Sequence, residues 1–321
     1  MEITALALAA GLVGWTPPHA QTTPTRPIAA ADPAPAPIVA SPSGALVTRE
    51  DLSAALVGPR LVAVGEKHDS LAQHRVQAEV LGMLADQVWN VAVGFEMISF
   101  EDQSILDDFA SGKTSEAEFA ALWKKAWGYD YAMYKPVFDE ARKHGLRLYG
   151  LNAPNTLVRL VAKKGLEGLT PAERARLPAK IQESSDARYR AFVYNSVTGH
   201  GPAGPSALKD LMLSLGVSAL SDPDAVARML QAMAVWNETM GEQAARHIAS
   251  GRTLFLVAGN GHVLYKAGVP ESARRRGAPS TLVVLPYPID DEPMTVPEML
   301  ARLRDPAQDD IQLADYFRLI P

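Results

Sequence analysis

The stretch LVAVGEKHDS, residues 61–70, is an apolar run that ends abruptly at a glycine, a carboxylate and an imidazole. Its first four residues, 61–64, show no polar alternation, which is typical of a strand buried on both faces of a parallel sheet. A second stretch, LFLVAGNGHV at residues 254–263, repeats the pattern and delivers His262 after its glycine. The two stretches predict one sheet edge at which polar side chains gather.

Strand-like and helix-like segments alternate along the chain. Short runs rich in Val and Leu predict strands at 61–64, 91–95, 146–151, 254–258 and 281–285. Apolar residues at helical spacing predict helices at 70–88, 135–144 and 223–250, with Pro136 in the first turn of the second and Gly145 and Gly251 after the last two. This alternation favours an α/β fold with a mostly parallel central sheet flanked by helices.

The N-terminal residues differ in composition from the rest of the chain. Residues 1–20 hold a short apolar run, ITALALAAGLVGW, which is typical of a signal peptide cut after Ala20 and is too short for a membrane-spanning helix. The alternative is a cytosolic chain with an unusual leader, since residue 2 is Glu where a signal peptide carries Lys or Arg. Residues 21–44 are rich in Pro and Ala and predict a disordered linker.

The remaining residues, 45–321, are enough for a single α/β domain with a full core. Residues 165–222 interrupt the strand-helix alternation and predict a mostly helical insertion that serves as a lid. A net charge of −5 and a pI near 5.8 give no basic footprint for nucleic acid. The chain has no cysteine, which excludes disulfides, thiolate metal ligands, a cysteine nucleophile and a lipid-modified cysteine.

Polar side chains follow four of the expected strands. Because ligands of open α/β sheets bind beyond the carboxyl ends of the strands, we expect these side chains to form one site. They are Glu66 and His68 after the first strand, Glu96 after the second, Asn152 after the third, and Asn260 and His262 after the fourth.

Three interpretations of this set remain open. Two histidines with a carboxylate suit a divalent metal ion held by His68, His262 and Glu96, while Glu66 activates water. Metal-free acid–base chemistry could use one glutamate with a raised pKa. In the third interpretation, Glu66 and His68 simply cap the helix that starts near Ser70.

The insertion offers a different kind of ligand. Tyr189, Tyr194 and His200 lie beside a Gly/Pro-rich loop, and a tyrosinate or imidazole there could be an axial ligand to haem iron; the alternative is an aromatic helix face packed on the domain. The run ARRR at 273–276 is either a solvated helix end or a partner for haem propionates. An aromatic cluster is expected to pack in the core or lid, and comprises Trp123, Trp127, Tyr129, Tyr131 and Tyr134.

The other histidines have plainer interpretations. His74 is expected on a polar helix face, with the pocket wall as the alternative. His144 and His247 lie in the last turns of helices, where a cation is favourable to the helix dipole, so both are taken as structural.

Four segments together resemble a known family. They are VAVGEKHDSLAQHRVQAEVL, VAVGFEMISFEDQSILDDFASGKTSEAEF, YKPVFDEARKHGLRLYGLNAP and LVAGNGHVLYKAGVP. The set is similar to the ChaN-like haem-binding uptake family of the Tiki/TraB/erythromycin-esterase-like superfamily, over roughly residues 50–290. The resemblance implies a single ChaN-like α/β domain, haem as cofactor and partner, a role in haem or iron uptake, and export to the periplasm or outer membrane.

The resemblance also implies that Glu66, His68, Glu96 and His262 match signature positions of the superfamily, which in the Tiki branch form a metal-dependent hydrolytic site. The expected partners are a second copy of the chain, which would form a homodimer, and the outer-membrane uptake machinery. Two departures stand out: no cysteine is present to carry a lipid, and Asn237 stands three residues before Met240 where an acidic residue is expected. The lead hypothesis is therefore a secreted haem- or iron-handling protein, with a metal-dependent hydrolase or a binding module without chemistry as alternatives.

Overall fold

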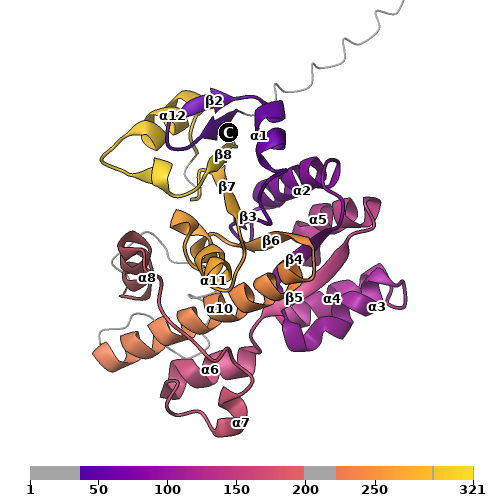
Figure 1. The fold of residues 1–321 in the computed structure, drawn as a ribbon, viewed down its shortest axis with the longest axis vertical. Coiled ribbons are helices and arrows are strands. Elements are labelled where there is room, and N and C mark those ends of the chain that lie inside the picture. The colour runs from indigo at the N-terminus through magenta and orange to yellow at the C-terminus, as the bar shows by residue number, and fades with distance from the viewer. Residues whose placement is uncertain (1–36, 199–221, 291–292, 321) are drawn as a thin grey trace, which may run out of the picture. The chain divides into compact units, whose positions relative to one another are not determined.

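The computed structural model describes residues 37–198, 222–290 and 293–320, and these contain one eight-stranded sheet (Figure 1). The strand order is β2-β1-β8-β7-β3-β6-β4-β5, and the pairs from β8 to β5 are all parallel. The strands are β1 (Ile38–Ala40), β2 (Ala45–Val47), β3 (Leu61–Glu66), β4 (Val91–Ser99), β5 (Arg147–Asn152), β6 (Thr253–Gly259), β7 (Thr281–Tyr287) and β8 (Tyr316–Leu319). The expected α/β fold with a mostly parallel sheet is confirmed.

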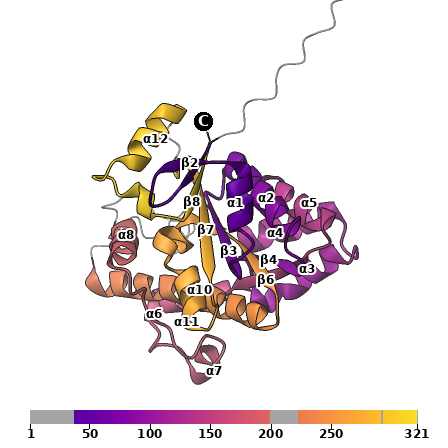
Figure 2. The same cartoon turned by 45° about the horizontal axis from the view of Figure 1, so that its top comes forward.

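Helices cover both faces of this sheet (Figure 2). Side chains alternate between the faces along β3, so Val62 and Val64 pack with helices α2 and α5 while Leu61 and Ala63 pack with α6 and α10. The helices are α1 (Arg49–Ala55), α2 (Leu71–Ala85), α3 (Gln103–Ala110), α4 (Glu116–Trp127), α5 (Tyr131–Lys143), α6 (Asn155–Lys164), α7 (Pro171–Arg174), α8 (Ala187–Thr198), α10 (Pro223–Ala249), α11 (Val269–Arg275) and α12 (Val296–Arg304). Short 3₁₀ turns are η1 (Phe100–Asp102), η2 (Asn260–His262), η3 (Leu264–Lys266) and η4 (Asp310–Gln312).

The five strands expected from apolar runs are β3, β4, β5, β6 and β7, and two expected helices match α2 and α10 within a few residues. The third, α5, begins four residues earlier than expected. Asp130 caps it by accepting a hydrogen bond from the Ala132 amide at 2.9 Å, so Pro136 lies inside the helix and not in its first turn. Gly145 follows this helix with φ +62°, and Gly251 follows α10 with φ +91°, as left-handed caps require.

The N-terminal side of the sheet differs from expectation. Residues as far as 44 were expected to form a linker, but Ile38–Ala40 is a strand, and Val39 is fully buried opposite Phe317 of β8. Burial of Ile38 and Val39 outweighs the Pro- and Ala-rich composition around them. The expected signal peptide and the linker up to residue 36 lie outside the described residues.

The other edge of the sheet is closed by a side chain. The Gln103 amide donates to the Leu148 carbonyl of β5 at 2.8 Å, and its oxygen accepts from the Gly150 amide at 2.9 Å. Gln103 therefore pairs with the edge strand as a neighbouring strand would.

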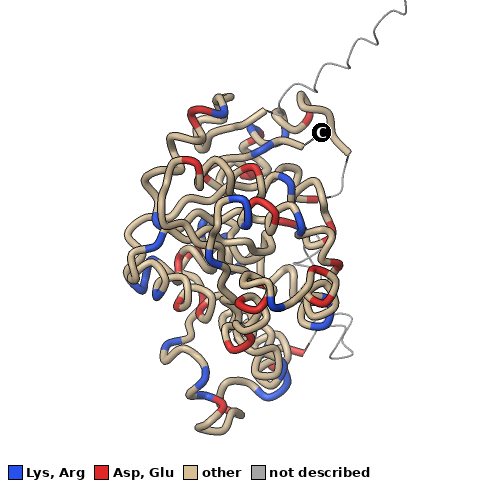
Figure 3. The backbone as a smooth tube through the Cα atoms, turned by 90° about the vertical axis from the view of Figure 1, so that its right-hand side faces the viewer, with Lys and Arg blue, Asp and Glu red and all other residues tan. Residues whose placement is uncertain are grey.

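The expected insertion contains α7 and α8 within residues 165–198, and His200 lies outside the described residues. Figure 3 shows basic and acidic residues interspersed along the described chain. Among the helices that the structure describes, none is long and apolar enough to cross a membrane.

Candidate functional site

Three strand ends converge on Gly259, the last residue of β6. β6 lies between β3 and β4 in the sheet, and Gly259 is in register with Glu66. A Cβ atom at Gly259 would lie 2.6 Å from His68 Cε1 and 3.5 Å from Glu96 Oε2. The absence of a side chain at residue 259 is therefore what allows the imidazole and the carboxylate to approach each other.

The first half of the cluster is built around Glu66. Its Oε1 atom lies 2.5 Å from His68 Nδ1 and accepts a longer bond, 3.5 Å, from the Tyr134 hydroxyl of α5. Tyr134 in turn accepts from the indole N–H of Trp127 at 3.0 Å. Burial and then the Glu66 carboxylate raise the pKa of Tyr134 well above its usual value, so this hydroxyl stays a donor.

His74 belongs to this half, although a polar surface position was expected. It is fully buried because its face of α2 packs over the end of β3. Its Nδ1 atom lies 2.9 Å from Gln77 Oε1, and its Nε2 atom lies 3.9 Å from Glu66 Oε2. Gln77 is fixed by donating to the Val64 carbonyl at 2.9 Å.

The second half of the cluster is built around His262. Its Nδ1 atom lies 2.8 Å from the Asn237 side-chain oxygen, and its Nε2 atom lies 3.1 Å from Glu96 Oε1. The Asn237 amide donates to the Tyr189 hydroxyl at 2.9 Å, and that hydroxyl donates to the Gly261 carbonyl at 2.7 Å. The His262 imidazole is thus held by residues of three elements: α10, the inserted helix α8 and the loop after β6.

Glu96 connects the two halves. Burial pushes the pKa of its carboxyl up, but His262, His68 and the Gly259 amide, which donates to Oε2 at 2.6 Å, together lower that pKa to about 2. The carboxylate is therefore ionised at neutral pH despite being 1% exposed.

The donor set suits a divalent cation. One ligand atom each from Glu66, His68 and Glu96 lie within 4.8 Å of one another, and all three residues are buried. Ten buried side-chain atoms of the described residues have no hydrogen-bond partner, and three of them belong to this part of the molecule: Glu66 Oε2, Asn260 Oδ1 and His262 Nε2. His262 Nε2 is near Glu96 but lacks hydrogen-bond geometry. Buried polar atoms without partners are rare and indicate a ligand or strain.

The helix-capping interpretation of Glu66 and His68 is wrong. The N-cap of α2 is Ser70, whose hydroxyl accepts from the Gln73 amide. Gln73 also accepts from the Lys67 amide at 2.7 Å, so the loop is satisfied without Glu66.

The two asparagines expected in the site differ. Asn260 lies over the end of β3, since a Cβ atom at Gly65 would be 2.4 Å from its Oδ1. Asn152, at the end of the edge strand β5, accepts from the neighbouring Ala153 amide at 2.8 Å. Among the described residues, this local bond is the side-chain hydrogen bond found for Asn152, and none joins it to Glu66, Glu96 or His262.

A pocket of about 330 Å³ lies between α8 and α10, and its lining includes Tyr189 and Asn237 of the cluster. Tyr194 is half exposed on its wall, whereas Tyr189 is buried with its hydroxyl engaged. The apolar part of the lining comprises Val193, Leu230, Met233 and Ala234.

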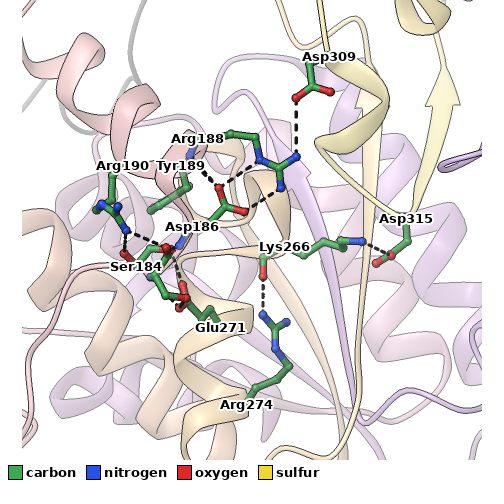
Figure 4. A network of polar contacts seen from close by, with 11 residues as sticks. Ser184, Asp186, Arg188, Tyr189, Arg190, Lys266, Glu271, Arg274, Asp309 and Asp315 are labelled. Atoms are coloured by element: carbon green, nitrogen blue, oxygen red, sulfur yellow. Dashed lines mark hydrogen bonds and ion pairs between the residues drawn. The ribbon is translucent and has the colours of Figure 1, made fainter. Parts of the chain in front are cut away.

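The arginine run beside this pocket is partly exposed, but two of its side chains form ion pairs with buried or partly buried carboxylates. Arg275 and Arg276 both pair with the buried carboxylate of Glu238, the latter at 2.5 Å, and Arg275 also lies 2.8 Å from Glu271. Glu271 accepts from the Ser185 amide at 2.9 Å and so joins the start of α8 to α11 (Figure 4).

Several residues of the cluster were not expected from sequence. Gln77 gave no signal, Tyr134 was expected only as packing, and Asn237 stood out only as a departure from the family pattern. His247 was expected to favour the helix dipole as a cation, but burial, Arg252 and Arg246 lower its pKa to about 4, so it is neutral at pH 7.

A family model described as "Haem-binding uptake, Tiki superfamily, ChaN" matches residues 52–272 of the chain. No curated protein matches the chain. A solved structure of cofacial haem binding to ChaN of Campylobacter jejuni superposes with a TM-score of 0.59 at 16% identity, covering 88% of this chain and 95% of that one.

Two further structures are less similar. The type III effector HopBA1 gives a TM-score of 0.44 at 11% identity, covering 84% of this chain and 90% of its own. An erythromycin esterase mutant in its open conformation gives 0.39 at 14% identity, covering 78% and 76%. At 16% identity the ChaN structure bears on the fold alone, and nothing is inferred from the other two.

Proposed function

Since the chain belongs to the ChaN-like haem-binding uptake family of the Tiki superfamily, we propose that it binds haem and acts in haem or iron uptake or handling. The observation that carries the placement of the haem is the half-exposed Tyr194 on the wall of the α8–α10 pocket. A phenolate is an established axial ligand of haem iron, and the apolar part of the lining suits the flat macrocycle. The residues present therefore fit the group.

The proposed partner is a second copy of the chain. Tyr194 lies at an open wall, so one face of a haem held there would remain uncovered and would favour a shared, face-to-face arrangement. The solved relative from Campylobacter jejuni is described as binding haem cofacially, which supports this arrangement. Contact with outer-membrane uptake machinery remains part of the same proposal.

The proposed location is the periplasm or the outer membrane. The support is the apolar run near the N-terminus together with family membership. Cell fractionation with N-terminal sequencing of the mature protein tests this, and a mature chain starting at residue 21 is the expected result. A full-length chain in the cytosol contradicts it.

Hemin titration of the purified chain tests haem binding. We expect a Soret band with saturable, stoichiometric binding, and a shift or loss of that band in Tyr194→Phe. His200→Gln is a second variant, because His200 is the other expected ligand. Tyr149→Phe is the matched control: this tyrosine stacks on His247 at 3.7 Å between ring centroids, a contact that phenylalanine keeps. A wild-type chain without a saturable band contradicts the proposal, and an unchanged band in both ligand variants contradicts the placement.

A second function is favoured by the compact set of carboxylate and imidazole donors at Gly259. We propose metal-dependent hydrolysis as the alternative, with His68, His262 and Glu96 holding a divalent ion and Glu66 accepting a proton from water. A divalent ion there would supply Lewis acidity and a water with a lowered pKa. The unpartnered Glu66 Oε2 and His262 Nε2 atoms support the fit.

Metal analysis with Co²⁺ titration separates the two functions. If the alternative holds, the wild-type chain binds one equivalent with a d–d spectrum, and the isosteric Glu96→Gln loses both. Tyr194→Phe is expected to leave the Co²⁺ spectrum unchanged. Absence of a bound ion at saturating Co²⁺ removes the alternative and leaves the haem proposal standing.

A further inference from the structure

We propose that Tyr189 is a positioning residue that locks the Asn237 amide and thereby fixes which nitrogen of His262 carries hydrogen. In this arrangement the Nδ1 atom keeps its hydrogen and the Nε2 atom is the one presented to the cluster. Any effect of this arrangement on cation binding rests on the metal-dependent function proposed above. The position of the hydrogen on the His262 ring does not depend on that function.

The direction of each hydrogen bond follows from a group that can only accept. The Gly261 carbonyl, 2.7 Å from the Tyr189 hydroxyl, has no hydrogen, so the hydroxyl donates to it. With its only hydrogen used, the Tyr189 oxygen accepts from Asn237, which places the amide NH₂ there at 2.9 Å. The Asn237 carbonyl oxygen therefore faces His262 Nδ1 at 2.8 Å and demands a hydrogen on that nitrogen.

The other nitrogen of the ring is then the variable one. His262 Nε2 lies 3.1 Å from Glu96 Oε1, is buried, and has no hydrogen-bond partner among the described residues. A lone pair facing a carboxylate at this distance is repulsive unless a positive charge lies between or on them. A positive charge at this point, on the ring itself or on a bound cation, is therefore favoured by the Glu96 carboxylate.

Tyr189 is itself held rigidly. Its amide donates to Asp186, which caps the first turn of α8, and Glu271 of α11 accepts from Ser184 and Ser185 just before that turn (Figure 4). A Cβ atom at Gly268 would lie 2.9 Å from the Tyr189 hydroxyl, so the backbone there closes over the ring. The hydroxyl has little room to move away from Asn237.

Loss of the hydroxyl allows the amide to turn over. In Tyr189→Phe the unturned Asn237 amide leaves both of its hydrogens without a partner. The turned amide donates one hydrogen to His262 Nδ1, and the ring then carries its hydrogen on Nε2, so that an N–H and not a lone pair faces Glu96 Oε1 at 3.1 Å. This replaces an electrostatic repulsion by an attraction, so we expect the turned state to dominate.

Long-range ¹H–¹⁵N NMR of the full chain labelled with ¹⁵N-histidine tests the lock without metal or haem. In the wild type we expect the Nδ1 signal of His262, assigned from its loss in His262→Gln, to be that of a protonated nitrogen. In Tyr189→Phe it moves toward an unprotonated nitrogen. The double variant Tyr189→Phe/Asn237→Asp restores the wild-type state, since a carboxylate cannot donate; Tyr149→Phe is the control.

An unprotonated Nδ1 in the wild type, or an unchanged signal in a folded Tyr189→Phe, overturns the proposal. Restoration by Asn237→Asp is not expected from a merely structural role of Tyr189. If the wild type binds Co²⁺, the affinity of Tyr189→Phe is expected to fall about 10- to 100-fold and to recover in the double variant. If the wild type binds none, the metal function fails while the NMR result still decides the lock.

Discussion

Two histidines lie at two strand ends that look alike in sequence, yet they are supported in different ways. His68 faces a carboxylate from its own strand, Glu66, at 2.5 Å. His262 faces an amide from a helix, Asn237, at 2.8 Å. The carboxylate can only accept, whereas the amide could present either end to the ring, and a third residue, Tyr189, is needed to set it.

The orientation of His68 follows from the chemistry of its partner alone, because a carboxylate can only accept. The orientation of His262 also depends on packing, because Tyr189 must hold the Asn237 amide in one of its two orientations. A local carboxylate orients its imidazole whatever the neighbouring residues are, but because it is buried its removal is costly. A neutral amide is cheaper to disturb but depends on distant elements. We therefore expect variants on the two sides to differ both in stability and in what restores them.

The largest effect is expected from Glu66→Ala. It leaves the buried His68 ring without its carboxylate partner, and removing one member of a buried carboxylate–imidazole pair costs about 3–5 kcal/mol of unfolding free energy. Urea unfolding followed by circular dichroism measures this. A loss below about 1 kcal/mol would show that the carboxylate does not stabilise His68.

Asn237→Ala on the other side is expected to cost less, about 1–3 kcal/mol, because it removes neutral hydrogen bonds and leaves the Tyr189 and His262 groups unpaired. The same urea unfolding experiment compares it with Glu66→Ala. If Asn237→Ala is the more destabilising of the two, the contrast between charged and neutral support fails.

Gly259→Ala affects both halves at once. The new methyl group would lie 2.6 Å from the His68 ring, so the imidazole must shift, and overpacking of this kind costs about 1–3 kcal/mol. Gly58→Ala is the matched control, since a Cβ atom there meets nothing within 4 Å. Thermal unfolding of both variants checks the difference, and equal melting temperatures would contradict it.

The smallest effect on stability is expected at His247, whose imidazole, among the described residues, pairs with neither a carboxylate nor an amide in the way that His68 and His262 do. Burial, Arg252 and Arg246 lower the pKa of His247 to about 4, against 6.5 in the unfolded chain. Above pH 6.5 the ring is neutral in both states; as the pH falls from 6.5 to 4 the unfolded chain takes up the proton first, so stability falls. Because the ring is partly exposed, we expect a loss of about 1–2 kcal/mol. We expect the unfolding free energy of His247→Gln to fall by about 1–2 kcal/mol less than that of the wild type between pH 6.5 and pH 4, as measured by urea unfolding at several pH values. An equal fall in both proteins would contradict the assignment.

The parts of the fold that followed from sequence are those with a strong local pattern. Continuous apolar runs located β3, β4, β5, β6 and β7, and the glycine that ends two of them located the cluster. Strand β1 was missed because its three residues lie in a Pro- and Ala-rich segment and are buried only through pairing with β8. A pattern of three residues carries too little signal to outweigh its surroundings.

The site shows the same division. Glu66, His68, Glu96 and His262 were expected together and lie close together, because parallel strand ends meet at one edge whatever the loops do. Gln77 and Tyr134 reach the cluster from helices, and their roles depend on crossing angles that no local pattern specifies. Asn152 lies at the correct sheet edge but on the outermost strand, which local sequence could not indicate.

The side chain of Gln103 has a consequence for assembly. It engages the Leu148 carbonyl and the Gly150 amide, which are the groups that an incoming strand would need at the β5 edge. Two copies cannot join there into one continuous sheet without first displacing this glutamine. At the β5 edge, self-association is therefore expected to use contacts between side chains and not backbone hydrogen bonds between strands.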